Sequence, residues 1–308
     1  MDFQPSLLVF APFLLLLFWF TRIYKNKITV KSVVHKLPPG PWKLPVIGNL
    51  HQLARADTLP HHTLQSLSHK YGPLMHLQLG EISAVIVSSP DMAKEIMKTH
   101  DLNFVQRPQL LCPKILAYGS TDIAFAPYGE YWRQMRKICT LELLSAKRVH
   151  SFSFIREEEV AKLIRSIQLC ACAGSQVNVS ENVFSFLSTL VSRTAFGKKS
   201  EKGNELLCLL KKGAELAGGF DLADLFPSLK AVHFLTRMKT KLENMHKELD
   251  KILESIISEH QSKHRNGDAE ENLVDVLLRV QQSATLEVPL TINNIKAVIW
   301  VSISINLL

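Results

Sequence analysis

The sequence predicts a mainly α-helical body with one small β-sheet element, behind an apolar N-terminal segment. Several long stretches carry Leu, Ile or Met every three or four residues with charges between them, the pattern of helices with one buried face. A single stretch alternates apolar and polar residues as a pair of strands does. Hydrophobic residues make up 46% of the 308 residues and charged residues 21%, which is typical of a folded protein with a sizeable core.

The first 24 residues are predicted to form a membrane anchor. Leu7–Phe20 carries no charge, and the wider segment Phe3–Tyr24 reaches the about 20 residues that a helix needs to cross a bilayer. A cleaved secretory signal peptide is the competing interpretation, but it needs a positive N-terminal flank, where this chain has only Asp2. Because positive charge follows the segment, the positive-inside rule places the body in the cytosol. These positive residues are Arg22, Lys25, Lys27, Lys31 and Lys36.

A basic and proline-rich hinge is predicted over 25–48, ahead of a body over 49–308. Its central run, Leu37-Pro-Pro-Gly-Pro-Trp42, is rich in proline, which imposes an extended backbone on itself and on the residue before it. We therefore expect a stiff spacer between the membrane and the body. A proline-rich ligand for a partner domain is the alternative interpretation.

The body opens with a predicted β-hairpin over Leu74–Val87 that turns at Gly80-Glu81. Ser89 and Pro90 have the residue types of an N-cap and a first helical position, so a helix is expected from there to about Thr99. The polar stretch 265–268 is expected to be a loop. Further helices are expected over about Glu130–Leu143, from Ser180-Glu181 to Gly197, over Leu229–His264, and from Thr291 as N-cap to the end of the chain.

Charge and cysteine usage narrow the class of partner and of site. The net charge of +8 is spread along the chain without a dense basic run, which argues against nucleic acid and favours membrane lipid or an acidic protein. The cysteines show no framework spacing, as expected of reduced cytosolic thiols. Cys170 and Cys172 lack a second ligand pair at suitable spacing, so no metal site is predicted. The adjacent His61 and His62 cannot share one helix face and are interpreted as structural or solvent-facing.

Residue chemistry alone stops at a membrane-anchored, helix-rich cytosolic domain, because no common catalytic motif is present. The order of several short blocks adds more. They are Leu37-Pro-Pro-Gly-Pro-Trp42, Leu44-Pro-Val-Ile-Gly-Asn-Leu50, Tyr71-Gly-Pro-Leu74, Phe104-Val-Gln-Arg-Pro108, Ala126–Cys139 and Asp224-Leu-Phe-Pro227. In this order, the chain up to Trp300 resembles a plant microsomal cytochrome P-450, most of all the group that hydroxylates terpenoids.

The resemblance implies a haem cofactor and assigns residues to it. Trp132 and Arg136 match the family's Trp-x-x-x-Arg motif, and at i and i+4 they share one helix face. An indole N–H and a guanidinium can there meet one carboxylate, which in the family is a haem propionate. Arg107 matches a second propionate contact. The plain alternative makes Trp132 a core residue and Arg136 a solvated charge.

The resemblance also implies a substrate and partners. The loop 110–125 matches the first variable substrate-contacting loop, where Ile123, Ala124 and Phe125 are predicted to line a pocket for a small apolar molecule; ordinary core residues are the alternative. The expected reaction inserts one oxygen atom of O₂ into that molecule, with electrons from NADPH through a reductase. Its expected place is the endoplasmic reticulum membrane, with a single-pass anchor and the body facing the cytosol. Residues expected to face an acidic reductase, unless they are plain solvated surface, are Arg133, Lys137, Lys147 and Arg148.

The family's iron ligand has no counterpart in this sequence. A Cys thiolate in a Phe-x-x-Gly-x-x-x-Cys-x-Gly loop holds the iron in this family. Cys172 is followed by Ala173-Gly174, but Gln168 stands where the motif needs its first Gly. The family's Glu-x-x-Arg pair and the acid-and-alcohol kink of the oxygen-activating helix are missing too, and the residues after Trp300 do not resemble the family. No catalytic or metal-ligating residue is therefore assigned.

We accordingly expect an incomplete cytochrome P-450 fold, interrupted in its oxygen-activating helix by a truncated gene model or a retained intron. Such a chain is predicted to be inactive alone. The alternative function is a non-catalytic membrane protein that acts only through interactions or is turned over. A helical tethering protein unrelated to haem would leave the ordered blocks unexplained.

Overall fold

A computed structural model describes residues 37–54, 58–197, 201–217, 221–229, 237–264, 271–283 and 286–307. The predicted anchor, 1–24, the first part of the predicted hinge and the predicted loop 265–268 lie outside the described residues. Within the described ranges, no helix is both long enough and apolar enough to cross a membrane.

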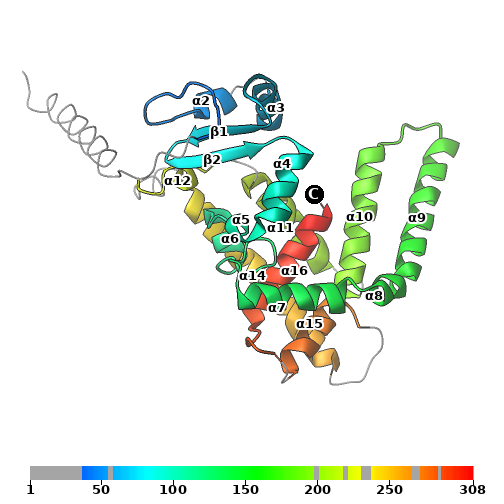
Figure 1. Ribbon diagram of the computed structural model, residues 1–308. Helices are drawn as coiled ribbons and strands as arrows, with labels where there is room; N and C mark the ends of the chain where they lie inside the picture. The colour runs from blue at the N-terminus through cyan, green and yellow to red at the C-terminus, as the bar shows by residue number, and fades with distance from the viewer. Residues whose placement is uncertain are drawn as a thin grey trace, which may run out of the picture.

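Helices build most of the described body, and the one sheet is a two-stranded hairpin, so the predicted fold class is confirmed (Figure 1). The strands are β1 (Leu74–Leu79) and β2 (Ile82–Val87). The helices before the long C-terminal ones are α2 (Leu50–Leu53), α3 (Pro60–Tyr71), α4 (Pro90–Lys94), the π-helical turn η1 (Glu95–Thr99), α5 (Asp101–Phe104), α6 (Leu111–Leu116), α7 (Glu130–Ile138), the π-helical turn η2 (Cys139–Leu143) and α8 (Ala146–Ser151). The others are α9 (Ser153–Cys172), α10 (Val179–Phe196), α11 (Glu201–Ala217), α12 (Leu222–Leu225), α14 (Met238–His264), α15 (Leu273–Gln282) and α16 (Ile292–Leu307).

The hairpin forms where the alternating pattern predicts it. Its strands pair antiparallel from Leu74 opposite Val87 to Leu79 opposite Ile82. Gly80 makes the turn with a φ of +62°, and a Cβ there would lie 2.6 Å from the carbonyl oxygen of Leu225. The turn therefore needs glycine both for its backbone and for its close approach to α12.

The described part of the predicted hinge, 37–48, packs along β1. The His76 N–H donates to the Pro39 carbonyl at 2.9 Å. Asn49, which is 2% exposed, accepts from the Gln78 N–H at 2.8 Å and donates to the Trp42 carbonyl at 3.0 Å. The proline-rich part of the predicted hinge is consequently attached to the folded body.

The main core lies where α16 passes between α10, α11, α14 and α15 (Figure 1). Leu249 and Leu253 of α14 and Ile299 of α16 are fully buried in it. Gly213 of α11 packs directly against α16, because a Cβ on it would lie 2.9 Å from the Trp300 ring. The apolar sequence of α16 matches its place at the centre of the core.

Several predicted boundaries need correction. The helix predicted to begin at Ser180 is α10, which begins at Val179, because the Asn178 side chain caps it by accepting the Glu181 N–H at 3.2 Å. Its predicted end is confirmed, since Gly197 follows it in the left-handed region with a φ of +77°. The helix predicted from Leu229 is α14, which begins at Met238. The last turn of the helix predicted to end at Leu143 is π-helical.

Two predicted helix starts are confirmed by their caps. The Ser89 hydroxyl accepts the Met92 N–H at 3.3 Å, with Pro90 at the first helical position. The Thr291 hydroxyl accepts the Asn294 N–H at 3.2 Å at the start of α16. In both cases a local side chain satisfies an N–H that the helix itself leaves without a partner.

Candidate functional site

Trp132 and Arg136 lie together on α7, as their spacing predicts. The Arg136 guanidinium stands 5.1 Å from the centre of the Trp132 ring, within the range of a cation–π contact. Arg136 is exposed, and no ion pair holds it within the described part of the chain. Its charge is thus available to an anionic group that approaches this face of α7.

Arg107 is not joined to this pair. It lies in the segment after α5 and is exposed. No hydrogen bond or ion pair among the described residues links it to Trp132 or Arg136. The prediction that Arg107 provides a second contact to the same cofactor remains a prediction.

The Trp132 indole already has a hydrogen-bond acceptor within the protein. Its N–H donates to the Ile123 carbonyl at 2.9 Å. The neighbouring Tyr131 hydroxyl donates to the Thr121 carbonyl at 2.5 Å. Two aromatic residues of α7 thereby hold the loop in front of the helix, which carries the predicted pocket residues.

Sequence reasoning missed Asp122, which organises this loop. Its side chain is fully buried, and its Oδ1 accepts the Ala124 N–H at 2.7 Å and the Phe125 N–H at 2.9 Å. Burial raises the pKa of the Asp122 carboxyl, and these N–H groups counter only part of the rise. The available signal was the residue type: an Asp in a loop often accepts hydrogen bonds from the backbone N–H groups two and three residues after it.

The turn that directly precedes Thr121 has an unusual backbone. Tyr118, Gly119 and Ser120 have φ values of +51°, +81° and +59°, all in the left-handed region. This costs energy for the two residues that are not glycine. The Tyr118 hydroxyl donates to the Asp250 carboxylate of α14 at 2.8 Å, a contact that helps to hold the strained turn.

A cavity of about 660 Å³ opens beside this loop, and most of its lining is apolar. Phe125 is among the residues that line it. Ile123 and Ala124 do not line it and are half-buried against the main core. That these three residues contact a substrate remains a prediction. The remaining lining residues are Ile82, Pro108, Gln109, Leu110, Leu111, Cys112, Pro113, Lys114, Leu216, Asp221, Ala223, Asp224, Leu225, Pro227, Met238 and Leu242.

The thiols near these features are poor metal ligands as they stand. Burial raises the pKa of Cys112 to about 11, with the charges of Asp224 and Asp221 adding to the rise. Burial also raises the pKa of Cys139 to about 11. Both are therefore protonated at neutral pH, whereas the metal ligand is the thiolate. In the part of the chain that the structure describes, no group of three or more His, Cys, Asp or Glu side chains is placed to hold a metal ion.

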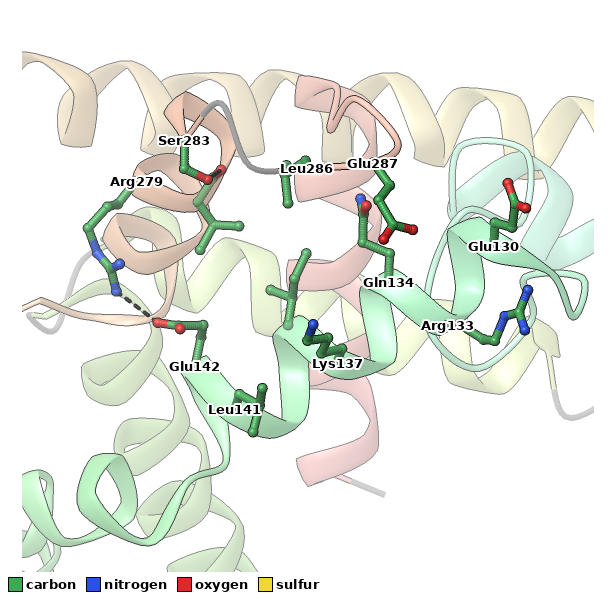
Figure 2. Close-up of a pocket in the computed structure, with 12 residues that line it drawn as sticks. Glu130, Arg133, Gln134, Lys137, Leu141, Glu142, Arg279, Ser283, Leu286 and Glu287 are labelled. Atoms are coloured by element: carbon green, nitrogen blue, oxygen red, sulfur yellow. Dashed lines mark hydrogen bonds and ion pairs between the residues drawn. The ribbon is translucent and has the colours of Figure 1, made fainter.

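A second cavity, of about 720 Å³, lies between α7 and the segments around α15 (Figure 2). The Gln134 side chain binds both backbone groups of Val288, at 2.7 and 2.9 Å, and so fixes one wall. At the far end, Arg279 pairs with Glu142 at 3.0 Å (Figure 2). Acidic and basic side chains alternate along this cavity, so its lining carries no excess of one charge.

The residues expected to face a reductase divide into two groups. Arg133, Lys137 and Lys147 are exposed. Arg148 is instead half-buried and pairs with the Glu271 carboxylate at 2.9 Å, so its charge is already neutralised within the protein. Arg148 is thus better explained as a link between α8 and the start of α15 than as a partner contact.

Comparisons with known proteins identify the family of this chain. The family model described as Cytochrome P450 matches residues 38–303. Cytochrome P450 71D8 of Glycine max is 57% identical over 97% of this chain and 60% of its own length. Desmethyl-deoxy-podophyllotoxin synthase of Sinopodophyllum hexandrum is 53% identical over 97% of this chain, and premnaspirodiene oxygenase of Hyoscyamus muticus is 49% identical over 96%, each over 58% of its own length.

This chain therefore spans about three fifths of the length of these curated relatives. Among solved structures, a zebrafish cytochrome P450 studied with progesterone superimposes with a TM-score of 0.62 at 20% identity. That match covers 80% of this chain and 56% of the other, and it shows the same fold. On the family model and on the identity to these relatives, this chain belongs to the cytochrome P450 family, whose cofactor is haem.

Proposed function

We propose that this chain forms the cofactor-facing and substrate-facing part of a haem-dependent monooxygenase. The proposed reaction inserts one oxygen atom of O₂ into a small apolar molecule such as a terpenoid, with electrons from NADPH through a reductase. The observation that carries the proposal is the placement of Arg136 on Trp132, with no ion pair to another described residue, next to a loop that lines an apolar cavity.

The residues present fit a haem at its carboxylate edge. An exposed guanidinium is well suited to hold a carboxylate, and Arg136 is exposed and forms no ion pair with another described residue. Arg107, also exposed, is the candidate for the second carboxylate. Trp132 supports Arg136 through its ring, while its N–H serves the Ile123 carbonyl. When bound, haem supplies the activation of O₂, and these side chains bind and orient it.

The cavity supports an apolar substrate. Its volume of about 660 Å³ lies within the roughly 300–1,000 Å³ of typical small-molecule sites. Phe125, at the end of the loop that Tyr131 and Trp132 hold, forms part of the cavity wall. The name of one relative, premnaspirodiene oxygenase, is consistent with oxygenation of an apolar substrate, and we extend that class to this chain.

We further propose a single-pass anchor in the endoplasmic reticulum membrane, with the body facing the cytosol. The uncharged run Leu7–Phe20 and the positive residues that follow it support this place. A reductase with an acidic face would meet Arg133, Lys137 and Lys147, which are exposed. Salt would weaken such an association, because exposed charges are screened.

A second candidate function is a non-catalytic membrane protein. It is favoured by the raised pKa values of Cys112 and Cys139, which leave both thiols protonated at neutral pH. On this reading the 308-residue chain has no turnover alone.

Two measurements on membranes carrying the 308-residue chain test these proposals. The first is a reduced, CO-bound difference spectrum, which we expect to lack the shifted Soret band of thiolate-ligated haem. The appearance of that band would overturn the non-catalytic alternative and require one of the five cysteines as ligand.

The second measurement is a titration with haem of the wild type, Arg136→Gln and Lys137→Gln. Loss of a charge-assisted contact of about 1.5–3 kcal/mol weakens binding by about ten- to a hundredfold, and we expect this for Arg136→Gln. Lys137→Gln is the matched control, because Lys137 is exposed on the same helix but does not touch Trp132. Equal affinities for all three proteins would contradict the carboxylate role of Arg136.

A further inference from the structure

Among the hydrogen bonds of the loop Thr121–Phe125, four involve either an aromatic side chain of α7 or the Asp122 carboxyl. Two of its carbonyls accept from α7, at Thr121 from the Tyr131 hydroxyl and at Ile123 from the Trp132 indole. Two of its N–H groups, those of Ala124 and Phe125, donate to the Asp122 carboxyl. The carbonyls bound by α7, at 121 and 123, come before the N–H groups at 124 and 125, and Asp122 lies between the two carbonyls.

The Asp122 side chain faces the loop backbone and is shielded from solvent. The residue is 0% exposed, and its Oδ2 has no hydrogen-bond partner among the described residues. Burying a carboxyl with one oxygen unsatisfied is costly, so the two bonds to Oδ1 must offset part of that cost. Asp122 belongs to no helix, and capping a helix end therefore does not explain its position.

The loop joins the two halves of the proposed site. Phe125 at its end lines the 660 Å³ cavity. Ile123 in its middle binds the indole that supports Arg136. Since an indole has a single N–H, the link between Trp132 and the cavity wall passes through the Ile123 carbonyl.

We propose that Asp122 is a positioning residue of this site: it fixes the cavity wall at Phe125 relative to the Trp132–Arg136 pair, and the Trp132 N–H completes the same clamp. The inference rests on the proposed function for the meaning of the two halves. The clamp itself is a property of this chain without haem, and it can be tested without it.

The first test is amide hydrogen exchange of the 308-residue chain in membranes, read by mass spectrometry on peptides that cover 122–126. Trp132→Phe removes the indole N–H and touches neither Asp122 nor the amides of Ala124 and Phe125. If the bonds act as one clamp, these amides exchange about five- to tenfold faster in this variant, the effect of losing one hydrogen bond. Trp42→Phe is the matched control, because Trp42 is exposed and far along the chain from the loop.

Asp122→Ala and Asp122→Asn separate positioning from general stability. Asp122→Ala removes the acceptor and is expected to speed exchange over 122–126 about tenfold or more. Asp122→Asn keeps an oxygen acceptor of the same shape and is expected to restore protection close to that of the wild type. Peptides over Leu249 and Leu253 in the main core report global stability and are expected to stay unchanged in both.

A reciprocal signal comes from fluorescence. The component of the emission that disappears in Trp132→Phe reports Trp132, and Asp122→Ala is expected to shift it although Asp122 does not touch the indole. The proposal is overturned if Trp132→Phe leaves the 122–126 amides as protected as in the wild type, or if Asp122→Asn behaves like Asp122→Ala. Should Asp122→Ala fail to fold, the Trp132→Phe result alone decides. Failure of the haem titration would count against the proposed function and leave the clamp standing.

Discussion

The region around α16 and the hairpin of α9 and α10 are both helical, but they are held in different ways. Around α16, side chains from distant parts of the sequence are fully buried together, among them Leu253 and Ile299. The α9–α10 hairpin stands off to one side of the body (Figure 1). On it Val160 and Ile164 remain 41% and 50% exposed. The candidate site therefore depends on the first region, because its loop is anchored there. The α9–α10 hairpin keeps apolar side chains exposed within the described body.

Polar contacts also join more distant segments around α16 than in the α9–α10 hairpin. Lys296 of α16 is buried and donates to Asp250 at 2.7 Å and to Glu254 at 2.5 Å, and Asp250 also binds Tyr118 of the site loop. In the hairpin, Arg193 joins Glu158 and Glu159 at 2.7 Å. The first network connects three separate segments, whereas the second connects only the two neighbouring helices.

The largest effect is expected from Leu253→Ala. This side chain is 0% exposed, and removing it from a packed core lowers the free energy of unfolding by about 2–5 kcal/mol. Ile164→Ala removes a similar side chain that is half exposed on the hairpin and should change stability by about 0.5 kcal/mol or less. Urea unfolding followed by circular dichroism measures both, and equal losses would remove the contrast between the two regions.

The next largest effect is expected from Lys296→Met. It removes charged hydrogen bonds from two carboxylates that stay partly exposed, so we expect a loss of about 1.5–3 kcal/mol in the same assay. Lys251→Met, at an exposed position of α14, is the control and should be nearly neutral. A loss no larger than that of the control would show that the buried network is not what joins α14 to α16.

The pH range of this network follows from its partners. Burial lowers the pKa of Lys296, but hydrogen bonds with Asp250 and Glu254 outweigh it and raise the pKa above its usual value. Burial raises the pKa of Asp250, but the bonds from Lys296 and Tyr118 outweigh it and lower the pKa. The network should thus contribute fully between the unfolded-state pKa values of about 4 and about 10, and be lost outside them.

The smallest effect concerns the hairpin and its pH dependence. Burial alone would raise the pKa of Glu159, but hydrogen bonds from Lys162 and Arg193 hold it below its usual value. The stability from this carboxylate is therefore present above the unfolded-state pKa of about 4.3 and is lost as pH falls through the lower folded-state value. Arg193→Met should cost about 1 kcal/mol at neutral pH and flatten this acid dependence.

Hydrogen exchange of peptides from α9 and α10 between pH 3 and 7, corrected for intrinsic rates, measures this effect. Arg165→Met is the control, because Arg165 is exposed on α9. An acid dependence that survives in Arg193→Met would assign it to another carboxylate.

Local signals were enough for much of the fold. The β1–β2 hairpin, the cap at Ser89 and the helix end at Gly197 each depend on a few consecutive residues, and each is confirmed. The start of α10 was misplaced because Asn178 and Ser180 are both good caps, and only the backbone decides between them. The start of α14 was misplaced because apolar spacing continues upstream of the helix.

Within the candidate site, the contact between two side chains of one helix could be predicted from the sequence. Trp132 and Arg136 meet because i and i+4 side chains share a face. The pairing of Arg148 with Glu271 could not be predicted, because the two residues are 123 positions apart and no spacing rule connects them. Asp122 was overlooked for the opposite reason: its partners are two and three residues away, in a loop whose path the sequence does not specify.

The close contact between Gly213 and Trp300 has a consequence for how relatives of this chain vary. A Cβ at 213 would lie 2.9 Å from the indole ring of Trp300, too near for any methyl group unless the ring moves. A larger residue at 213 should therefore accompany a smaller one at 300, and such correlated exchange between α11 and α16 should be visible across related sequences.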